Sequence, residues 1–189
     1  VDSPMALRAL HTYRQAISAR AADVRPDLHD HPDPFDTGQL HEVRDVEGSR
    51  ALAGMAHPAI IVAASGMASG GRVLHHLARL LPDPRNTVVL VGYQAAGTRG
   101  RQLADGARDL KMLGTYVRVR AEIANLASFS VHADHDELVG WIRDATPRPD
   151  TVYLVHGEPK GAQLLQNAIA ADLDISTVVP AHLERVRLA

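Results

Sequence analysis

The sequence predicts an α/β protein in which three-layer βα units build a mainly parallel sheet, followed by an αβ segment at the carboxy terminus. Three short apolar runs, at 59–64, 87–91 and 151–155, have the composition of buried parallel strands. Each run is followed by a glycine-containing turn and then by a stretch with helical composition. Repeated succession of strand, turn and helix is typical of α/β folds.

The composition is that of an ordinary globular protein. Of the 189 residues, 46% are hydrophobic and 22% are charged. The sequence has no cysteine, which excludes disulfides, thiolate metal sites and cysteine nucleophiles. Any metal chemistry must therefore use histidine and carboxylate ligands. Because no apolar run is long enough to span a bilayer, we expect a cytoplasmic protein.

The net charge of −2 hides an uneven distribution. Residues 23–47 contain eight acids against two arginines, a net charge of −6. Residues 72–120 contain eight arginines and one lysine against three aspartates, a net charge of +6. A solvated helical surface and an anion-binding surface both remain open as explanations of the basic region.

The first part of the chain predicts a helix at 4–22, since Pro4 suits the first helical turn. Residues 23–40 have loop composition, with three prolines and several aspartates and histidines. A short strand is predicted at 40–43 and a helix at 46–55. These elements lead to the first clear βα unit.

That unit consists of a strand at 59–64, a glycine-rich turn at 65–71 and a helix at 72–81. Glycine lets a backbone approach a ligand closely, and the amides at a helix start suit an anion. The turn at 65–71 is therefore a candidate anion-binding loop. The spacing matches neither the dinucleotide-binding fingerprint nor the P-loop, so glycines that only permit a tight turn remain an alternative.

The next unit has a strand at 87–91, a loop at 92–98 and a helix at 99–107. Arg99 and Arg101 lie in the first turn of this helix, where the helix dipole disfavours cations. Their position is easier to understand if an anion binds there. A hairpin around Gly114 is predicted to follow.

Two strand-to-helix junctions then each carry a histidine. A strand at 123–129 precedes His132, and Asp134 with Glu137 resembles a capping box for a helix that ends near residue 145. The strand at 151–155 precedes His156, and Pro159 opens another helix. Ligands of open α/β sheets bind at the carboxyl ends of the strands, so we expect both imidazoles to face one cleft. Short strands at 176–179 and 183–188 are predicted to close the chain.

The two junctions resemble signatures of the β-CASP nucleases, the RNA- and DNA-cleaving members of the metallo-β-lactamase superfamily. Residues 128–134, Ser-Phe-Ser-Val-His-Ala-Asp, are similar to F-S-A-H-A-D, and residues 155–158, Val-His-Gly-Glu, match V-H-G-E. The resemblance continues through 1–4, 60–72 and 91–101. The resemblance covers most of the chain, and its motifs follow one another in the same order as in the family.

Residues 130–135 also invite comparison with H-x-H-x-D-H, the loop that holds two zinc ions in this superfamily. Ser130 stands where the leading histidine should be, and serine is a poor zinc ligand. Asp134 is already explained as a helix cap. We therefore reject this segment as the main metal loop.

The resemblance implies a division into a β-CASP domain at 1–110 and the carboxy-terminal segment of a metallo-β-lactamase domain at 111–189. It implies that His156 is catalytic and a direct zinc ligand, and that His132 lies by the scissile phosphate as a catalytic group. The β-CASP part would contact the nucleic acid backbone through a set of polar and basic residues, namely Ser65, Gly66, Arg72, Thr98, Arg99 and Arg101.

The family holds two zinc ions mainly through an amino-terminal domain whose H-x-H-x-D-H loop is not in this sequence. We therefore expect a portion of a zinc-dependent nuclease that hydrolyses phosphodiester bonds in RNA, internally or from the 5′ end. Alone, it should bind zinc weakly or not at all and cleave nothing. Its expected partners are RNA or other single-stranded nucleic acid and the amino-terminal lactamase domain, and a homodimer remains open. The alternatives are a non-catalytic nucleic-acid-binding module and a doubly wound nucleotide-phosphate binder.

Overall fold

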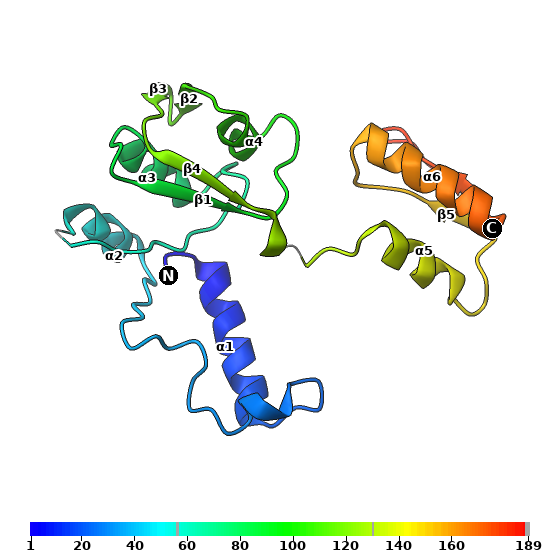
Figure 1. Cartoon of the computed structure of the whole chain (residues 1–189), viewed down its shortest axis with the longest axis horizontal. Helices are drawn as coiled ribbons and strands as arrows, with labels where there is room; N and C mark the ends of the chain where they lie inside the picture. The colour runs from blue at the N-terminus through cyan, green and yellow to red at the C-terminus, as the bar shows by residue number, and fades with distance from the viewer. Residues whose placement is uncertain (56, 130, 188–189) are drawn as a thin grey trace. The chain divides into compact units, whose positions relative to one another are not determined.

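The computed structural model describes residues 1–55, 57–129 and 131–187 (Figure 1). Contacts divide the chain into two units, Val1–Phe129 (unit 1) and Ser130–Ala189 (unit 2). Each is described by itself. Within the described ranges, no helix is both long enough and apolar enough to cross a membrane.

Unit 1 is built on a parallel pair of strands, β1 (Thr87–Val91) and β4 (Glu122–Leu126). Alternate residues of β1 turn to opposite faces, so Val88 and Leu90 face the core while the other face of the strand is exposed. Helices α3 (Val73–Leu80) and α4 (Arg99–Ala104) belong to the same unit, and their apolar side chains join those of the strands in one core. The most buried members of this core are Ala68, Leu81, Leu90, Leu103, Leu110 and Met112.

The remaining elements of unit 1 are α1 (Pro4–Ser18), η1 (Pro26–Leu28), α2 (Val46–Ala51), η2 (Leu52–Gly54), η3 (Ala127–Phe129) and the antiparallel hairpin of β2 (Asp109–Met112) and β3 (Thr115–Arg118). The hairpin turn consists of Leu113 and Gly114, with φ angles of 49° and 83°. Two successive left-handed residues match the twist of the flanking strands, which makes such turns favourable in hairpins.

The carboxylate of Asp2 is the buried polar centre of unit 1, with a fully buried side chain. Its Oδ1 accepts a hydrogen bond from Arg72 Nη1 at 2.6 Å, and its Oδ2 lies 2.5 Å from Ser49 Oγ and 2.7 Å from His76 Nε2. Its backbone N–H donates to Val62 O at 2.8 Å. Burial raises the pKa of Asp2, but the bonds from Ser49, His76 and Arg72 outweigh burial and hold this pKa below its ordinary value.

Unit 2 contains α5 (His135–Arg143), β5 (Thr151–Tyr153), α6 (Pro159–Leu173) and β6 (Ser176–Val178). Strands β5 and β6 pair in parallel, and α5 and α6 pack on each other. The capping box at the start of α5 forms as predicted: Asp134 accepts from Glu137 N, and Glu137 accepts from Asp134 N. The core is formed by Val139, Ile142, Ile169, Leu173 and Ile175.

The α/β class is confirmed, and so are the strand at 87–91 and the hairpin around Gly114. Three predicted strands are wrong. Residues 40–43 and 59–64 form no regular strand. Residues 40–43 bond Val1 through Val43 N to Val1 O and through the Val1 amino group to His41 O, and residues 59–64 bond Asp2 N through Val62 O. These bonds do not extend into ladders. An apolar run is compatible with a sheet, but a strand also needs a neighbour with which to pair along its length.

The third wrong prediction is the strand at 183–188, of which residues 183–187 are described. Leu183 has a φ of 64° and lies in a turn that Glu184 N closes on Ala181 O at 3.0 Å. A left-handed residue interrupts an extended strand. The helix predicted at 4–22 also ends earlier, at Ser18.

Replacing Asp2 with Asn should lower the free energy of unfolding at pH 7 by about 3–5 kcal/mol, because the partly buried Arg72 loses its counter-charge. The folded pKa of Asp2 lies below its unfolded value, so its stabilising contribution is complete above about pH 4 and is lost as the pH falls further. The measurement is urea unfolding of both proteins at several pH values.

The control is Asp109→Asn, which removes an exposed partner of Arg118 and should cost less than about 1 kcal/mol. The stability difference between wild type and Asp2→Asn should shrink between pH 5 and pH 3. A difference that is small at pH 7, or that stays constant over this range, would contradict the role given to Asp2.

Candidate nucleic-acid interface and histidine site

The glycine-rich turn at 65–71 and the loop at 92–98 lie against each other. Gln94 Nε2 donates to Gly66 O at 3.3 Å, and Gly100 N donates to Met67 O at 2.9 Å. The glycine-rich turn follows residues 59–64, and the loop at 92–98 follows β1. The structure therefore brings the segment of Ser65 and Gly66 to the start of α4, and their joint role in binding phosphate stays a prediction.

Only glycine fits at position 100 without rearrangement. A Cβ added there would lie 1.8 Å from Gln94 Oε1 and 3.1 Å from Met67 Cα. Gln94 is 5% exposed, and its amide nitrogen already bonds Gly66 O and Gly92 O. Moving its side chain would cost these bonds, so the close approach of the two loops depends on Gly100.

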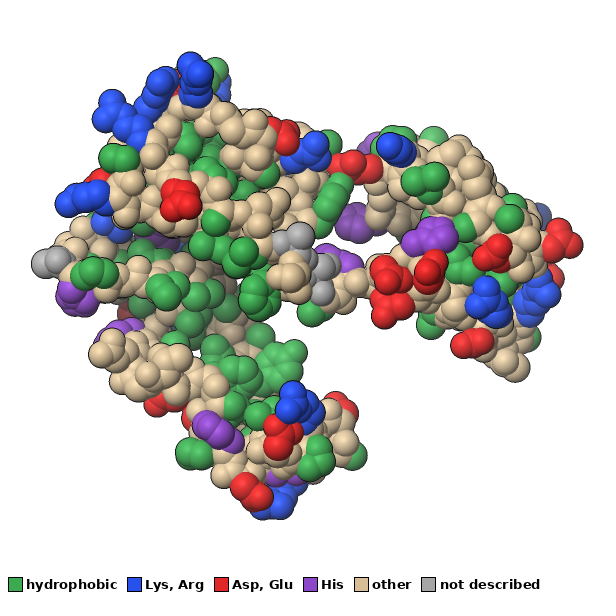
Figure 2. Space-filling view, viewed as in Figure 1, with side chains coloured by type: hydrophobic (Ala, Val, Ile, Leu, Met, Phe, Trp, Pro, Cys, Tyr) green, Lys and Arg blue, Asp and Glu red, His purple; other side chains and the backbone are tan. Residues whose placement is uncertain are grey.

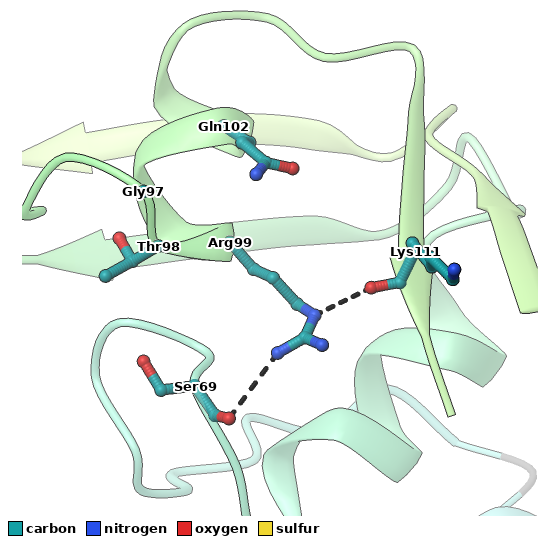
Figure 3. A pocket seen from close by; sticks show the side chains of 6 residues that line it. All are labelled: Ser69, Gly97, Thr98, Arg99, Gln102 and Lys111. Atoms are coloured by element: carbon teal, nitrogen blue, oxygen red, sulfur yellow. Dashed lines mark hydrogen bonds between the residues drawn. The ribbon is translucent and has the colours of Figure 1, made fainter. Parts of the chain in front are cut away.

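Arg99 forms hydrogen bonds to both the glycine-rich turn and the hairpin of β2 and β3 (Figure 3). Its Nε donates to Lys111 O at 2.7 Å, and its Nη1 donates to Ala68 O and Ser69 O at 3.3 and 3.4 Å. In Figure 3 the Lys111 carbonyl faces Arg99 while the Lys111 side chain points away. These carbonyls give Arg99 a structural reason for its place at the start of α4, in addition to the predicted anion.

A surface pocket of about 390 Å³ surrounds this guanidinium. Carbonyl acceptors are neutral, and no carboxylate pairs with Arg99 among the described residues. The positive charge of Arg99 is therefore not neutralised by a counter-charge, and an anion in the pocket would experience it. The lining residues are Ser69, Gly97, Thr98, Arg99, Gln102 and Lys111.

The two predicted hydroxyl groups also serve the local backbone. Thr98 Oγ1 donates to Ala95 O at 2.6 Å and accepts from Arg101 N at 3.2 Å, which caps α4. Ser65 Oγ accepts from Ser69 N at 3.4 Å. Capping leaves each hydroxyl oxygen with further acceptor capacity. Their contact with a phosphate stays a prediction.

The surplus of basic charge at 72–120 is real, because its three aspartates can offset only part of it. Asp83, Asp105 and Asp109 pair with Arg85, Arg101 and Arg118. Arg72 pairs with Asp2. Among the described residues, the bases of this range without a carboxylate partner are Arg79, Arg99, Arg108, Lys111 and Arg120.

Basic side chains gather at the end of unit 1 where the hairpin of β2 and β3 lies (Figure 2). Arg108 and Arg120 flank the open end of this hairpin, where Val119 N bonds Arg108 O at 2.8 Å. Arg72 and Arg101, by contrast, each have a carboxylate partner. The predicted contributions of Arg72 and Arg101 to phosphate binding are therefore expected to be smaller than that of Arg99.

Both predicted histidines are exposed and lie at helix starts in unit 2. His132 precedes Asp134, the N-cap of α5, and His156 lies between β5 and α6. His156 has a φ of 64°, a left-handed conformation that turns the chain from strand into helix. In Figure 1, α5 and α6 begin at the same end of unit 2, where β5 ends. This placement is compatible with a common site for the two imidazoles. The common site and the catalytic roles of His132 and His156 stay predictions.

The part of the chain that the structure describes contains no group of side chains that could by itself hold a zinc ion. His156 is of the right donor type, since its exposed ring has no hydrogen-bond partner among the described residues. However, no three histidine, aspartate or glutamate side chains within 1–55, 57–129 and 131–187 lie close enough together to hold a metal ion. Catalytic zinc needs about three protein ligands. Ser130, which the sequence analysis excluded as a ligand, lies outside the described residues.

Two family models match the chain in succession. Residues 1–103 match the Beta-Casp domain, and residues 116–180 match the Zn-dependent metallo-hydrolase RNA specificity domain. These two matches place the α/β chain in the class of Beta-Casp and RNA-specificity domains of metallo-hydrolases. The boundary predicted between residues 110 and 111 stays a prediction, since it falls in the interval between the two matches.

Several curated proteins are similar to the chain. It is 37% identical over 160 residues to the transcription termination factor FttA of Pyrococcus abyssi, covering 82% of this chain and 25% of that protein. It is 38% identical over 170 residues to Ribonuclease TTHA0252 of Thermus thermophilus, covering 90% and 38%. It is 39% identical over 123 residues to an RNase J-like protein of Methanocaldococcus jannaschii, covering 65% and 28%.

The chain belongs to the β-CASP family of metallo-β-lactamase nucleases and corresponds to a carboxy-terminal part of its members. It spans between 25% and 38% of the length of these three curated relatives. The resemblance noted at the two histidine junctions is thereby confirmed at the level of the family.

Replacing Gly100 with Ala should lower the free energy of unfolding by about 1–3 kcal/mol, because a methyl group must displace the buried Gln94 amide. The measurement is thermal or urea unfolding. Gly161→Ala is the matched control, since nothing lies within 4 Å of its added Cβ in α6. That variant should be neutral or up to about 1 kcal/mol more stable. Equal effects of the two substitutions would show that the contact at Gly100 is not tight.

Proposed function

We propose that this chain is part of a zinc-dependent nuclease that hydrolyses phosphodiester bonds in RNA in the cytoplasm, internally or from the 5′ end. Unit 1 supplies contacts to the RNA backbone, and unit 2 supplies two histidines of the catalytic centre. The observation that carries the proposal is the succession of a Beta-Casp match and an RNA specificity match along one chain. The similarity to a protein named a ribonuclease supports it.

The proposed roles of the histidines follow from imidazole chemistry. His132 would donate a hydrogen bond or a proton to an oxygen of the scissile phosphate, a task that suits an imidazole. His156 would supply one ligand to zinc in the whole protein, and the other ligands would come from sequence beyond this chain. The exposure of both side chains supports these roles, because a buried ring could not reach a substrate.

The proposed RNA contacts centre on the two loops that Arg99 and Gly100 hold together. Thr98 and Arg99 border the pocket at the start of α4, and Ser65 and Gly66 lie in the adjoining turn. Arg72 and Arg101 would contribute less, since their charges are already paired. Contacts of this kind recognise phosphate rather than bases, so binding should show little sequence preference.

The basic surplus also favours a second candidate, a nucleic-acid-binding module without catalysis. Phosphate binding by the unpaired bases of unit 1 would serve either function equally well. The two candidates differ only in whether His132 and His156 take part in bond cleavage.

Binding of a 12-nucleotide RNA, measured by fluorescence anisotropy, should weaken steeply as salt rises, because bound counterions are released. Arg108 and Arg120 have no carboxylate partner among the described residues. Joint replacement of both by Gln should reduce the slope of log K against log salt by about 1–2. Arg148→Gln, which removes the same charge from an exposed residue of unit 2, should leave the slope unchanged. Absence of RNA binding at about 50 mM salt would contradict the proposed function.

A further inference from the structure

A cavity of about 650 Å³ lies between α2 with η2 and α3 in unit 1. Its volume is within the range of about 300–1,000 Å³ typical of small-molecule sites. The hairpin turn between β2 and β3 borders it through Leu113, and Gly71 borders it at the end of the glycine-rich turn. The cavity is separate from the pocket around Arg99, and the two share no lining residue.

The lining of this cavity is basic. It contains three arginines and two histidines and no carboxylate. Arg72 and His76 are engaged by Asp2, whose buried oxygens have no further surface exposed to a ligand. Arg50 and Arg79 have no carboxylate partner among the described residues, so a positive surplus faces the cavity.

Arg79 is already oriented for this role. Its Nη1 and Nη2 donate to Ala53 O and Leu52 O at 3.2 and 3.4 Å, which fixes the guanidinium beside η2. Neutral carbonyls leave its charge unpaired. Arg50 lies on α2, about one helical turn before Ala53, and its side chain is exposed. No described residue accepts a hydrogen bond from it. Two guanidinium groups facing one cavity suit a phosphate, whose oxygens match their planar donor geometry.

Apart from Ser49, the rest of the lining is apolar, and two of its side chains are exposed to solvent. Val46 and Leu113 are 57% and 50% exposed, although both border the cavity. Leu113 is held in a left-handed conformation by the hairpin turn, which fixes its side chain at this edge. A free phosphate would leave these aliphatic groups in water. A ligand with an anionic group and a flat apolar body would cover them and gain from their burial.

We propose that this cavity binds a nucleoside monophosphate, with its phosphate on Arg50 and Arg79 and its base against Val46 and Leu113. The ligand is either a free nucleotide or one nucleotide of an RNA strand, since both present the same groups. The site does not depend on zinc or on the two histidines. The proposal for this cavity can therefore be tested independently of the proposed nuclease function.

The test is isothermal titration of the 189-residue chain with AMP, inorganic phosphate and adenosine. AMP should bind more tightly than either component. Arg50→Gln should weaken AMP about tenfold, because one charge-assisted contact is lost. Leu113→Asn should weaken AMP but not phosphate, and asparagine tolerates the left-handed backbone of this turn. Arg148→Gln is the charge-matched control and should bind AMP as the wild type does.

Three results would overturn the proposal: no AMP binding, unchanged AMP affinity in both cavity variants, or phosphate binding as tight as that of AMP. Circular dichroism of each variant would identify loss of fold as the cause of a weakened affinity. A five-nucleotide RNA then separates the two ligand sources. Displacement of AMP by the RNA assigns the cavity to a nucleotide within a strand, and failure to displace assigns it to a free nucleotide.

Discussion

A single buried carboxylate sets the arrangement of unit 1. Asp2 accepts from Arg72 through its side chain and donates to Val62 through its backbone, so it holds residues on both sides of the glycine-rich turn at 65–71. A buried charge is costly unless it is fully hydrogen-bonded, and Ser49 and His76 complete that requirement. The turn that meets the start of α4 is therefore positioned by a residue that lies far from it in the sequence.

Arginine serves two purposes in this structure. Arg72 and Arg101 have carboxylate partners, and their charges are largely used within the fold. Arg99 and Arg79 instead bond backbone carbonyls, which orients the side chain without neutralising it. Positive potential is thus concentrated at sites where the guanidinium is already held in place. Such preorganisation lowers the conformational entropy that binding an anion would otherwise cost.

Features formed by residues close together in the chain could be predicted from the sequence. Contacts between residues far apart in the chain could not. The capping box of Asp134 and Glu137 and the hairpin around Gly114 depend on residues close together in the chain, and both are observed. The run at 59–64 had strand composition but lacks a neighbour along its length, which composition cannot reveal. The pairing of Asp2 with Arg72 joins residues 70 positions apart, and the tight contact at Gly100 depends on Gln94. Neither had a recognisable pattern. His132 and His156 are predicted site residues because each follows a predicted strand and lies in a family signature.

We propose that His132 and His156 belong to one phosphodiester-cleaving centre, in which other sequence supplies most of the metal ligands. The most direct test places this chain in the matching region of Ribonuclease TTHA0252, to which it is 38% identical over 170 residues, and measures the rate of RNA cleavage. We predict an active chimera in which His132→Ala and His156→Ala each slow cleavage about a hundredfold or more. The control is His135→Ala, which replaces a neighbouring exposed histidine that bonds Asp136. Its cleavage rate should stay close to that of the unsubstituted chimera. An active chimera that tolerates the loss of both His132 and His156 would contradict the account.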